Sequence, residues 1–331
     1  MNHVVIAGNG IAGLTAGDTL RRLGHEGPIT VVGEEPYATY SRPALSKVAL
    51  APGDELDVGT LPGPTHGATE LLGRSVTGLD VGGKVVNLDD GTRLSYDGLI
   101  IATGSHARRF TSSEREYTIR SLDDASRLKA SLVDRPKVTV IGGGPLGMEV
   151  ASGAIGLGCD VTLVHPGTPM EMHLGPLLGG ILTDVALERG LKTVDAMVSS
   201  VHEDGEGMVV TLTDGAELSS DIVVTAAGDL ANTAWLADSG LLVDGRLVAD
   251  ERLRVADSIV AAGDVVWVDR GEGPRRTPIW TAAIEQAKVA AAALLQGDEA
   301  VPLDFQSYFW TDQWDLNLRM SGPTPQGVEP L

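Results

Sequence analysis

Two glycine-rich loops of the same pattern constrain the fold of this chain more than any other feature. Each has the form Gly-x-Gly-x-x-Gly and stands between an apolar run and a helix-compatible stretch. The loops are Gly8-x-Gly10-x-x-Gly13 and Gly142-x-Gly144-x-x-Gly147. The first glycine permits a tight turn, the second lets the backbone approach a pyrophosphate, and the third lets helix and strand pack closely. Because helix N-terminal N–H groups then face the phosphates, each loop predicts a dinucleotide site.

The segments around the loops alternate between strand-like and helix-like patterns. The expected strands are 4–8, 29–33, 138–142 and 161–164, the expected helices are 11–23, a stretch ending near Gly156 and 281–295, and residues 192–227 are rich in β pattern. Such alternation is typical of parallel sheets built from βαβ units. The sequence therefore predicts an α/β fold with two Rossmann-like dinucleotide-binding domains.

In each domain, the residue that follows the strand after the glycine-rich loop indicates how the adenosine ribose of the dinucleotide is bound. Glu34 stands there in the first domain and is placed to accept hydrogen bonds from a ribose diol. In the second domain His165 occupies this place, and no arginine pair follows to hold a 2′-phosphate. We expect NADH rather than NADPH, with NADPH left open. Glu149, one helical turn inward, lies either beside the nicotinamide or on an ordinary solvated helix face.

Two dinucleotide sites in one chain suggest that one holds FAD and the other a nicotinamide. Two further segments agree with this. IATG (101–104) ends a strand in small residues where a ligand can approach the backbone, and SIVAAGDVV (258–266) ends a strand at Gly263 and Asp264. The Asp264 carboxylate can hold the ribityl hydroxyls of a flavin; the alternative is that it caps the next helix.

Composition excludes several other classes of protein. The net charge of −20 and the aromatic content of 4% argue against nucleic acid and anionic membranes as partners. No apolar run is long enough to span a bilayer, and the N-terminus carries no signal-like pattern, so we expect a cytoplasmic protein. The one cysteine, Cys159, allows no internal disulfide and is expected to pack in the core, and the histidines show no metal-ligand spacing.

The stretch YSRPALSK (40–47), together with the motifs above, resembles a signature of one flavoprotein family. This family comprises the FAD-dependent, NAD(P)H-linked ferredoxin reductases of the putidaredoxin, rubredoxin and dioxygenase type, and apoptosis-inducing factor is similar. The segments 119–128, 226–241, 279–288 and 308–318 also resemble it. The resemblance implies a glutathione-reductase-like FAD/NAD(P) architecture.

The resemblance also implies roles for individual residues. Arg42 would contact the FAD diphosphate or adenosine, and Lys47 would lie near the flavin N5 and pair with Glu149. Trp280 would lie beside the flavin pyrimidine and Trp310 on its far face. The implied catalytic residues are Lys47, Glu149 and Trp310. The implied cofactor contacts also include Ile11, Ala12, Val76, Ala102, Thr103, Gly104, Arg108, Pro145, Leu146, Gly228, Gly263 and Ile279.

The same resemblance suggests four segments. They are residues 1–108 and 233–300 as two parts of an FAD-binding domain, 109–232 as the NAD(P)H-binding domain and 301–331 as a truncated C-terminal domain. Pro278 and Ile279 depart from the Glu-Ser pair usual in the family. Because aromatic residues crowd 308–314, we expect this segment to fold onto the flavin domain or to join a dimer. Either a monomer or a homodimer is compatible with this.

The expected reaction is hydride transfer from NADH to FAD, followed by electron transfer to a [2Fe–2S] ferredoxin-type protein. One alternative is a stand-alone reductase or oxidase acting on a small organic substrate, free flavin, quinone or oxygen. A less favoured alternative is a non-catalytic flavin- and NADH-binding signalling protein. The acidic net charge opposes an acidic ferredoxin. Arg270, Arg275 and Arg276 would form a local basic patch, or else a solvated loop.

Overall fold

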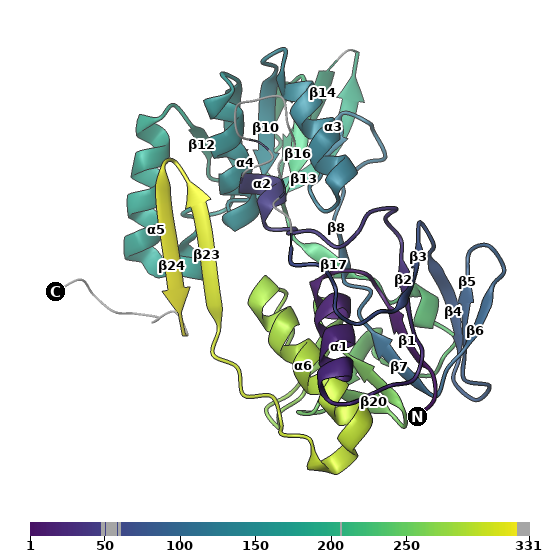
Figure 1. Ribbon diagram of the computed structural model, residues 1–331. Coiled ribbons are helices and arrows are strands. Elements are labelled where there is room, and N and C mark those ends of the chain that lie inside the picture. The colour runs from purple at the N-terminus through teal and green to yellow at the C-terminus, as the bar shows by residue number, and fades with distance from the viewer. Residues whose placement is uncertain (48–49, 51–57, 59–60, 206, 323–331) are drawn as a thin grey trace. The chain divides into compact units, whose positions relative to one another are not determined.

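The computed structural model describes residues 1–47, 50, 58, 61–205 and 207–322 (Figure 1). The chain divides into two compact units, each made from three stretches of sequence. Unit 1 is Met1–Ser41, Thr60–His106 and Ala231–Tyr308, and unit 2 is Arg42–Gly59, Ala107–Leu230 and Phe309–Leu331. Two stretches of unit 2 differ from the expected domains. Residues 42–59 were expected in the FAD-binding domain, and residues 309–331 in a separate C-terminal domain.

Unit 1 is built on a six-stranded sheet in the order β20-β21-β7-β1-β2-β3. The strands are β1 (Val4–Ala7), β2 (Ile29–Gly33), β3 (Thr69–Leu72), β7 (Gly98–Ile101), β20 (Arg254–Ala256) and β21 (Ile259–Ala261). All neighbouring pairs from β21 to β3 are parallel, and β20 is antiparallel to β21. Strands β1, β2, β7 and β21 are buried along their whole length, which is why they read as continuous apolar runs.

Helices α1 (Ile11–Arg22) and α6 (Trp280–Gln296) pack against each other in unit 1 (Figure 1). Their buried residues are largely alanine and glycine, so the two helices approach closely. Two small sheets complete the unit, together with the short helices η1 (Ala234–Leu236) and η2 (Gly297–Glu299). One small sheet contains β4 (Val76–Asp80), β5 (Val85–Leu88) and β6 (Arg93–Ser95), and the other contains β18 (Leu242–Val243), β19 (Arg246–Ala249) and β22 (Val266–Val268).

Unit 2 is built on a five-stranded parallel sheet in the order β12-β11-β10-β16-β9. Its strands are β9 (Glu116–Tyr117), β10 (Lys137–Ile141), β11 (Asp160–Val164), β12 (Lys192–Val194) and β16 (Ile222–Thr225). Its helices are α2 (Ala44–Lys47), α3 (Leu122–Leu132), α4 (Pro145–Gly156) and α5 (Glu171–Glu188). Helix α5 is broken at Gly175, whose φ of 77° and ψ of 171° are not helical.

Two further sheets belong to unit 2. Strands β13 (Val198–Asp204), β14 (Gly207–Leu212) and β15 (Glu217–Ser220) form an antiparallel sheet. Strands β23 (Tyr308–Gln313) and β24 (Leu316–Ser321) form a hairpin whose first residue belongs to unit 1. The short strands β8 (Ser105–Ala107) and β17 (Asp229–Ala231) lie at two further described positions where the chain passes between units, and the remaining described position is between Ser41 and Arg42.

The secondary structure expected around the glycine loops is confirmed. Strands β1, β2, β10 and β11 and helices α1, α4 and α6 begin and end within about one residue of the expected positions. The agreement has a physical reason, because most of these boundaries fall next to a glycine or at the end of an apolar run. Within the described part of the chain, no helix combines the length and the apolar character that a membrane span requires.

Candidate functional site

The first glycine loop, in unit 1, has the geometry of a diphosphate cradle. Gly8 has a φ of +121°, and a Cβ added there would lie 2.1 Å from the carbonyl oxygen of Ala102. A Cβ on Gly13 would lie 2.0 Å from the carbonyl oxygen of Gly8, whereas one on Gly10 would meet nothing within 4 Å. Helix α1 therefore packs directly against its strand while open space remains in front of its N-terminus. This arrangement fits the diphosphate of a dinucleotide such as FAD.

Two carboxylates of unit 1, Glu34 and Asp264, are the acids expected to bind FAD, and each lies at a strand or turn end. Glu34 follows β2 and is exposed. Asp264 follows Gly263, whose φ is +84°, and Ser105 Oγ donates a hydrogen bond of 3.4 Å to Asp264 Oδ2. Strand β22 follows Asp264, so the alternative that this aspartate caps a helix is wrong. The N–H of Gly263 donates to Gln286 Oε1 at 2.8 Å and fixes the turn against α6.

Several other residues expected to contact FAD lie at or next to element ends of unit 1, whereas Arg42, Lys47 and Arg108 belong to unit 2. Thr103 follows β7, and its hydroxyl donates to the Asn232 carbonyl at 2.9 Å. Gly104 has a φ of +67°, which glycine adopts without strain. Ile279 is the N-cap of α6 and Trp280 is its first helical residue. Of the remaining residues, Ile11 and Ala12 open α1, Val76 opens β4 and Ala102 directly follows β7.

The second glycine loop, in unit 2, repeats the same geometry. A Cβ on Gly142, whose φ is +108°, would lie 2.4 Å from the carbonyl oxygen of Ala226, and one on Gly147 would lie 1.8 Å from that of Gly142. Gly144 is the N-cap of α4, and Pro145 is its first residue. Leu146 follows in the first turn. Gly228 has a φ of +95°, and its carbonyl accepts the N–H of Arg108 at 3.1 Å.

A hollow of about 330 Å³ opens in front of this second loop. The residues that form its wall include Phe110, Gly143, His165, Met170, His173 and Ala227. It lies beyond the carboxyl ends of β10 and β11, which is where open α/β sheets bind dinucleotides. His165, in the position where an acid was expected, is therefore part of a built cavity.

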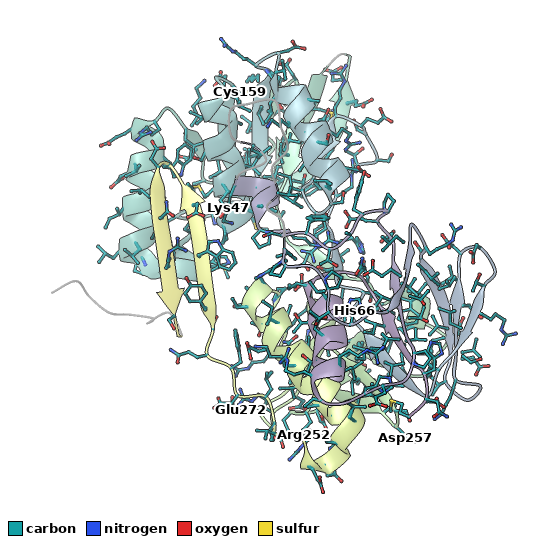
Figure 2. The ribbon with its side chains drawn as sticks, viewed as in Figure 1. Lys47, His66, Cys159, Arg252, Asp257 and Glu272 are labelled. Carbon is teal, nitrogen blue, oxygen red and sulfur yellow. The ribbon has the colours of Figure 1, made fainter. Side chains whose placement is uncertain are left out.

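A buried polar network in unit 2 joins the residues expected to be catalytic. The Nζ of Lys47, on α2, lies 2.9 Å from Oε1 and 3.0 Å from Oε2 of Glu149, on α4 (Figure 2). The same carboxylate accepts the hydroxyls of Ser46 at 2.5 Å and Thr311 at 2.6 Å. Because Glu149 is only 4% exposed, the alternative of a solvated helix residue is wrong. The Lys47–Glu149 pairing is confirmed, while its position relative to a flavin stays a prediction.

The aromatic segment contributes to the same network. Lys47 Nζ lies 5.7 Å from the centroid of the Trp310 ring, within the range of a cation–π contact. The backbone N–H of Trp314 donates to Ser152 Oγ at 2.8 Å, and Trp314 is 4% exposed. We expected this segment to fold onto the flavin domain or to join a dimer. The carbonyl of its first residue, Tyr308, accepts the hydroxyl of Thr281 on α6 of unit 1 at 2.6 Å, so the expected packing on the flavin domain is met at that end. Its hydrogen bonds to Glu149 and Ser152 reach α4 of unit 2, and the dimer alternative stays a prediction.

The arginines expected to bind FAD or a protein partner lie at several separate places. Arg42 donates from Nη1 to the carbonyl of Arg120 at 2.5 Å within unit 2. Of the expected basic patch in unit 1, Arg275 pairs with Glu272 at 3.4 Å. Arg276 donates from Nε to the carbonyl of Asp264 at 2.5 Å. This contact links the arginine-rich loop to one of the expected flavin-binding residues.

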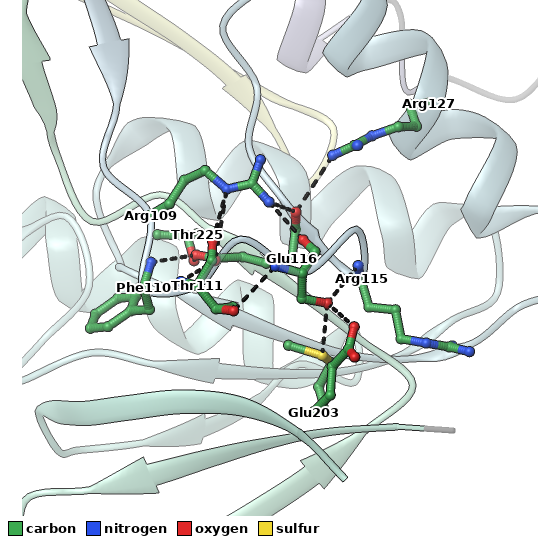
Figure 3. Close-up of polar contacts among 10 residues, drawn as sticks. Arg109, Phe110, Thr111, Arg115, Glu116, Arg127, Glu203 and Thr225 are labelled. Carbon is green, nitrogen blue, oxygen red and sulfur yellow. Dashed lines mark hydrogen bonds and ion pairs between the residues drawn. The ribbon is translucent and has the colours of Figure 1, made fainter. Parts of the chain in front are cut away.

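Glu116 is a functional-site neighbour that the sequence did not reveal. It is fully buried, and its carboxylate accepts the N–H groups of Phe110 at 2.9 Å and Thr111 at 2.7 Å and the Thr225 hydroxyl at 2.7 Å (Figure 3). Arg109 Nε lies 3.8 Å from its Oε2. These bonds fix Phe110, which forms part of the hollow's wall. A single acid in a polar stretch carries no motif that would distinguish it.

Cys159 has the packing role expected of it. It is buried, and its Sγ lies 3.7 Å from the carbonyl oxygen of Leu132. Burial raises the pKa of the thiol above its ordinary value, although Arg135 opposes this. Among the described residues, no three His, Cys, Asp or Glu side chains come together as a metal site would require.

Comparisons with known proteins place this geometry among flavin and nicotinamide enzymes. A family model described as "Pyridine nucleotide-disulphide oxidoreductase" matches residues 2–292. The chain is 33% identical to a 3-phenylpropionate/cinnamic acid dioxygenase ferredoxin–NAD(+) reductase component of Photorhabdus laumondii, over 96% of this chain and 83% of the relative. It is 34% identical to the ferredoxin–NAD(+) reductase component of an anthranilate 1,2-dioxygenase system of Burkholderia cepacia, over 96% and 81%. A putidaredoxin reductase–putidaredoxin complex matches with a TM-score of 0.86 and 30% identity, over 97% and 81% of the chains.

Proposed function

We propose an electron-transfer function from one premise: the chain belongs to the pyridine nucleotide-disulphide oxidoreductase family. The resemblance to ferredoxin reductases and the expected architecture with two dinucleotide-binding folds are both confirmed. The protein is thus an FAD-dependent NAD(P)H oxidoreductase. Its family name includes disulphide chemistry, but its single thiol is buried in unit 2.

The proposed reaction passes hydride from NADH to FAD and then electrons to a [2Fe–2S] ferredoxin-type protein. One observation carries this proposal: the chain contains two glycine cradles, each closed by its third glycine against its first. Two such cradles suit one resident dinucleotide and one exchangeable one. The names of the relatives, ferredoxin–NAD(+) reductase components, support a ferredoxin-type acceptor.

Unit 1 supplies the residues that would hold FAD. Its first loop would take the diphosphate at the N-terminus of α1, the exposed Glu34 would accept from the adenosine ribose, and Asp264 would accept from the ribityl chain. Bound FAD supplies hydride acceptance from NADH and release of the electrons to a one-electron acceptor. The protein's own contribution is position and electrostatics.

Unit 2 supplies the residues that would act at the nicotinamide and near the flavin. The second loop and the hollow would bind NADH with its diphosphate at Gly144. Lys47 would stabilise negative charge near the flavin edge, because Glu149 and the Trp310 ring hold its ammonium group in one place. Ser46 and Thr311 donate to the Glu149 carboxylate and would hold it in position.

The charge of the chain bears on the choice of partner. A net charge of −20 opposes encounter with an acidic ferredoxin, unless a local basic area steers it. Unit 1 carries such an area at Trp267, whose ring lies 5.3 Å from the Arg276 guanidinium and 6.0 Å from that of Arg246. A small organic acceptor, free flavin, quinone or oxygen is the second candidate, favoured by the overall acidity.

Steady-state kinetics with NADH and with NADPH tests the proposal. Ferredoxin, cytochrome c, ferricyanide, quinone and oxygen serve as acceptors for the FAD-loaded protein. We expect NADH to bleach the flavin faster than NADPH near neutral pH, and ferredoxin to be reduced fastest, with a rate that depends on salt. Ferricyanide reduction without ferredoxin reduction would favour the small-molecule alternative. Reduction of no acceptor would favour a binding function.

A further inference from the structure

Two imidazole rings lie against the second glycine loop. His165 directly follows β11 and His173 lies on α5, and both belong to the wall of the hollow. A Cβ on Gly143 would lie 2.7 Å from Cδ2 and Cγ of His165, and a Cβ on Gly144 would lie 3.6 Å from Cε1 of His173. The two rings therefore border the surface that a dinucleotide's ribose and diphosphate approach.

The hollow contains no carboxylate among its lining residues. Outside the lining, Asp195 accepts the N–H of Gly167 through Oδ1 at 2.8 Å, and its charge acts on His165. Glu171 opens α5 and is exposed, and the first turn of α4 has no acidic residue. On the remaining side the Phe309 ring, which is uncharged, lies 6.4 Å from the His173 ring. The charge of this wall is therefore set largely by the two histidines.

We propose that His165 and His173 select between NADH and NADPH according to pH. This inference rests on the proposed function, since it concerns the adenosine end of the nucleotide in the same site. Neutral imidazoles accommodate the ribose diol of NADH, and protonated imidazoles hold the 2′-phosphate of NADPH. A carboxylate in the same position would repel that phosphate at every pH above its own titration.

The direction of the pH dependence follows from the surroundings of the rings. Burial lowers the pKa of His165 below its ordinary 6.5, partly offset by Asp195. Partial burial against the wall of the hollow, and then the charge of His165, lower the pKa of His173, although the residue as a whole is exposed and its shift is accordingly the weaker support. Both rings are thus neutral at about pH 8, and they gain protons at a lower pH than an ordinary histidine does. A phosphate monoester keeps at least one negative charge over this range, so affinity for the 2′-phosphate rises as the pH falls.

The test measures binding of the oxidised nucleotides, which carry no hydride. Calorimetry on the FAD-loaded protein compares NADP⁺ with NAD⁺ at about pH 5.5 and about pH 8, at constant ionic strength. One charge-assisted contact corresponds to a change in Kd of about tenfold or more. Protonated rings would also attract the diphosphate that both nucleotides share, so the 2′-phosphate is reported by the difference between them. We therefore expect the affinity for NADP⁺ to rise about tenfold more than the affinity for NAD⁺ between the higher and the lower pH.

Neutral variants locate the effect. His165→Asn and His173→Asn should each reduce the rise in affinity for NADP⁺ at the lower pH, and the double variant should abolish this gain. His165→Glu should tighten NAD⁺ and weaken NADP⁺. His202→Asn, at an exposed histidine of the same unit outside the hollow's lining, is the matched control and should keep the gain. Circular dichroism and the thermal midpoint check that each variant is folded.

Several results would overturn the inference. These are a Kd for NADP⁺ that changes with pH no more than the Kd for NAD⁺ does, a gain that survives in the double variant, and a failure of either nucleotide to bind at any pH. A protein that reduces no ferredoxin but shows the gain would contradict the proposed acceptor while supporting the role of the histidines. The two proposals therefore fail in distinguishable ways.

Discussion

The Lys47 ammonium lies within 3.0 Å of both carboxylate oxygens of Glu149, although the two residues are 102 positions apart. The side chain of Lys47 is 12% exposed and that of Glu149 is 3% exposed, so the ion pair is largely removed from water. Two hydroxyl donors complete the environment of the carboxylate. An ion pair with this degree of burial depends on both partners, because a single charge left there has lost its hydration.

Replacing one partner should therefore destabilise unit 2. We expect Lys47→Met to lower the free energy of unfolding by about 3–5 kcal/mol, and to slow flavin reduction by NADH. The double variant Lys47→Met/Glu149→Leu should recover most of the stability but none of the rate. Denaturant unfolding and stopped-flow absorbance measure the two effects.

Lys192→Met is the matched control for this comparison. Lys192 pairs with Asp160 at 2.6 Å on the surface of the same unit, where the two side chains are 61% and 49% exposed. Its loss should cost less than about 1 kcal/mol. If both lysine variants lowered the free energy of unfolding by the same amount, the buried pair would contribute no more to stability than the exposed one.

Asp264→Asn should weaken FAD retention without unfolding unit 1. The substitution keeps the shape of the side chain but removes its charge, and a hydrogen bond to a charged acceptor is worth about tenfold or more in Kd. Fluorescence titration of the apoprotein with FAD measures the change. Asp257→Asn, at an exposed aspartate just before β21, should retain FAD normally (Figure 2). Equal retention by both variants would remove Asp264 from the flavin site.

Trp310→Ala should brighten flavin fluorescence and speed its reoxidation by oxygen. The ring contacts the Lys47 ammonium, and an aromatic ring stacked near a flavin would quench its emission and restrict access of oxygen. Tyr308→Ala, two positions earlier on the same strand and partly exposed, is the control. If neither signal changes in the Trp310 variant, the tryptophan serves only to pack β23.

Cys159→Ser should leave the rates of flavin reduction and reoxidation within about twofold of the original. The thiolate is the reactive form, and burial raises the pKa of this thiol, so the native protein at about pH 8 holds it as the thiol. Iodoacetamide should accordingly label Cys159 slowly in the native state and rapidly after denaturation. Rapid native labelling, or loss of turnover in a folded serine variant, would show that this sulfur takes part in the chemistry.

The fold could be predicted from sequence because its constraints are local. In both loops the third glycine meets the carbonyl of the first at a distance that admits no Cβ, so the spacing of Gly8 and Gly13 reports the packing directly. The buried parallel strands reveal themselves as uninterrupted apolar runs. These features need no knowledge of the distant parts of the chain.

The site was predictable only where a motif or a family resemblance marked it. Resemblance supplied the pairing of Lys47 with Glu149, but nothing pointed to Thr311, which donates to Glu149 from 162 positions away. Glu116 likewise depends on N–H groups that only the folded chain presents to it. The alternative role of Asp264 failed because a strand, not a helix, follows it. Long-range contacts of single polar residues leave no periodic pattern in a sequence.

The shared carboxylate of Glu149 also sets an order of events during protein synthesis. Its donors Ser46 and Lys47 emerge from the ribosome before it, whereas Thr311 follows 162 residues later. At roughly 5–20 residues per second, that interval lasts roughly 10–30 s. Until then the Glu149 carboxylate lacks one of its hydroxyl donors. The segment that contains Trp314 and packs on α4 has not yet been made either. The five parallel strands of unit 2 are therefore all synthesised, the last ending at Thr225, before the chain supplies the last hydroxyl donor to Glu149.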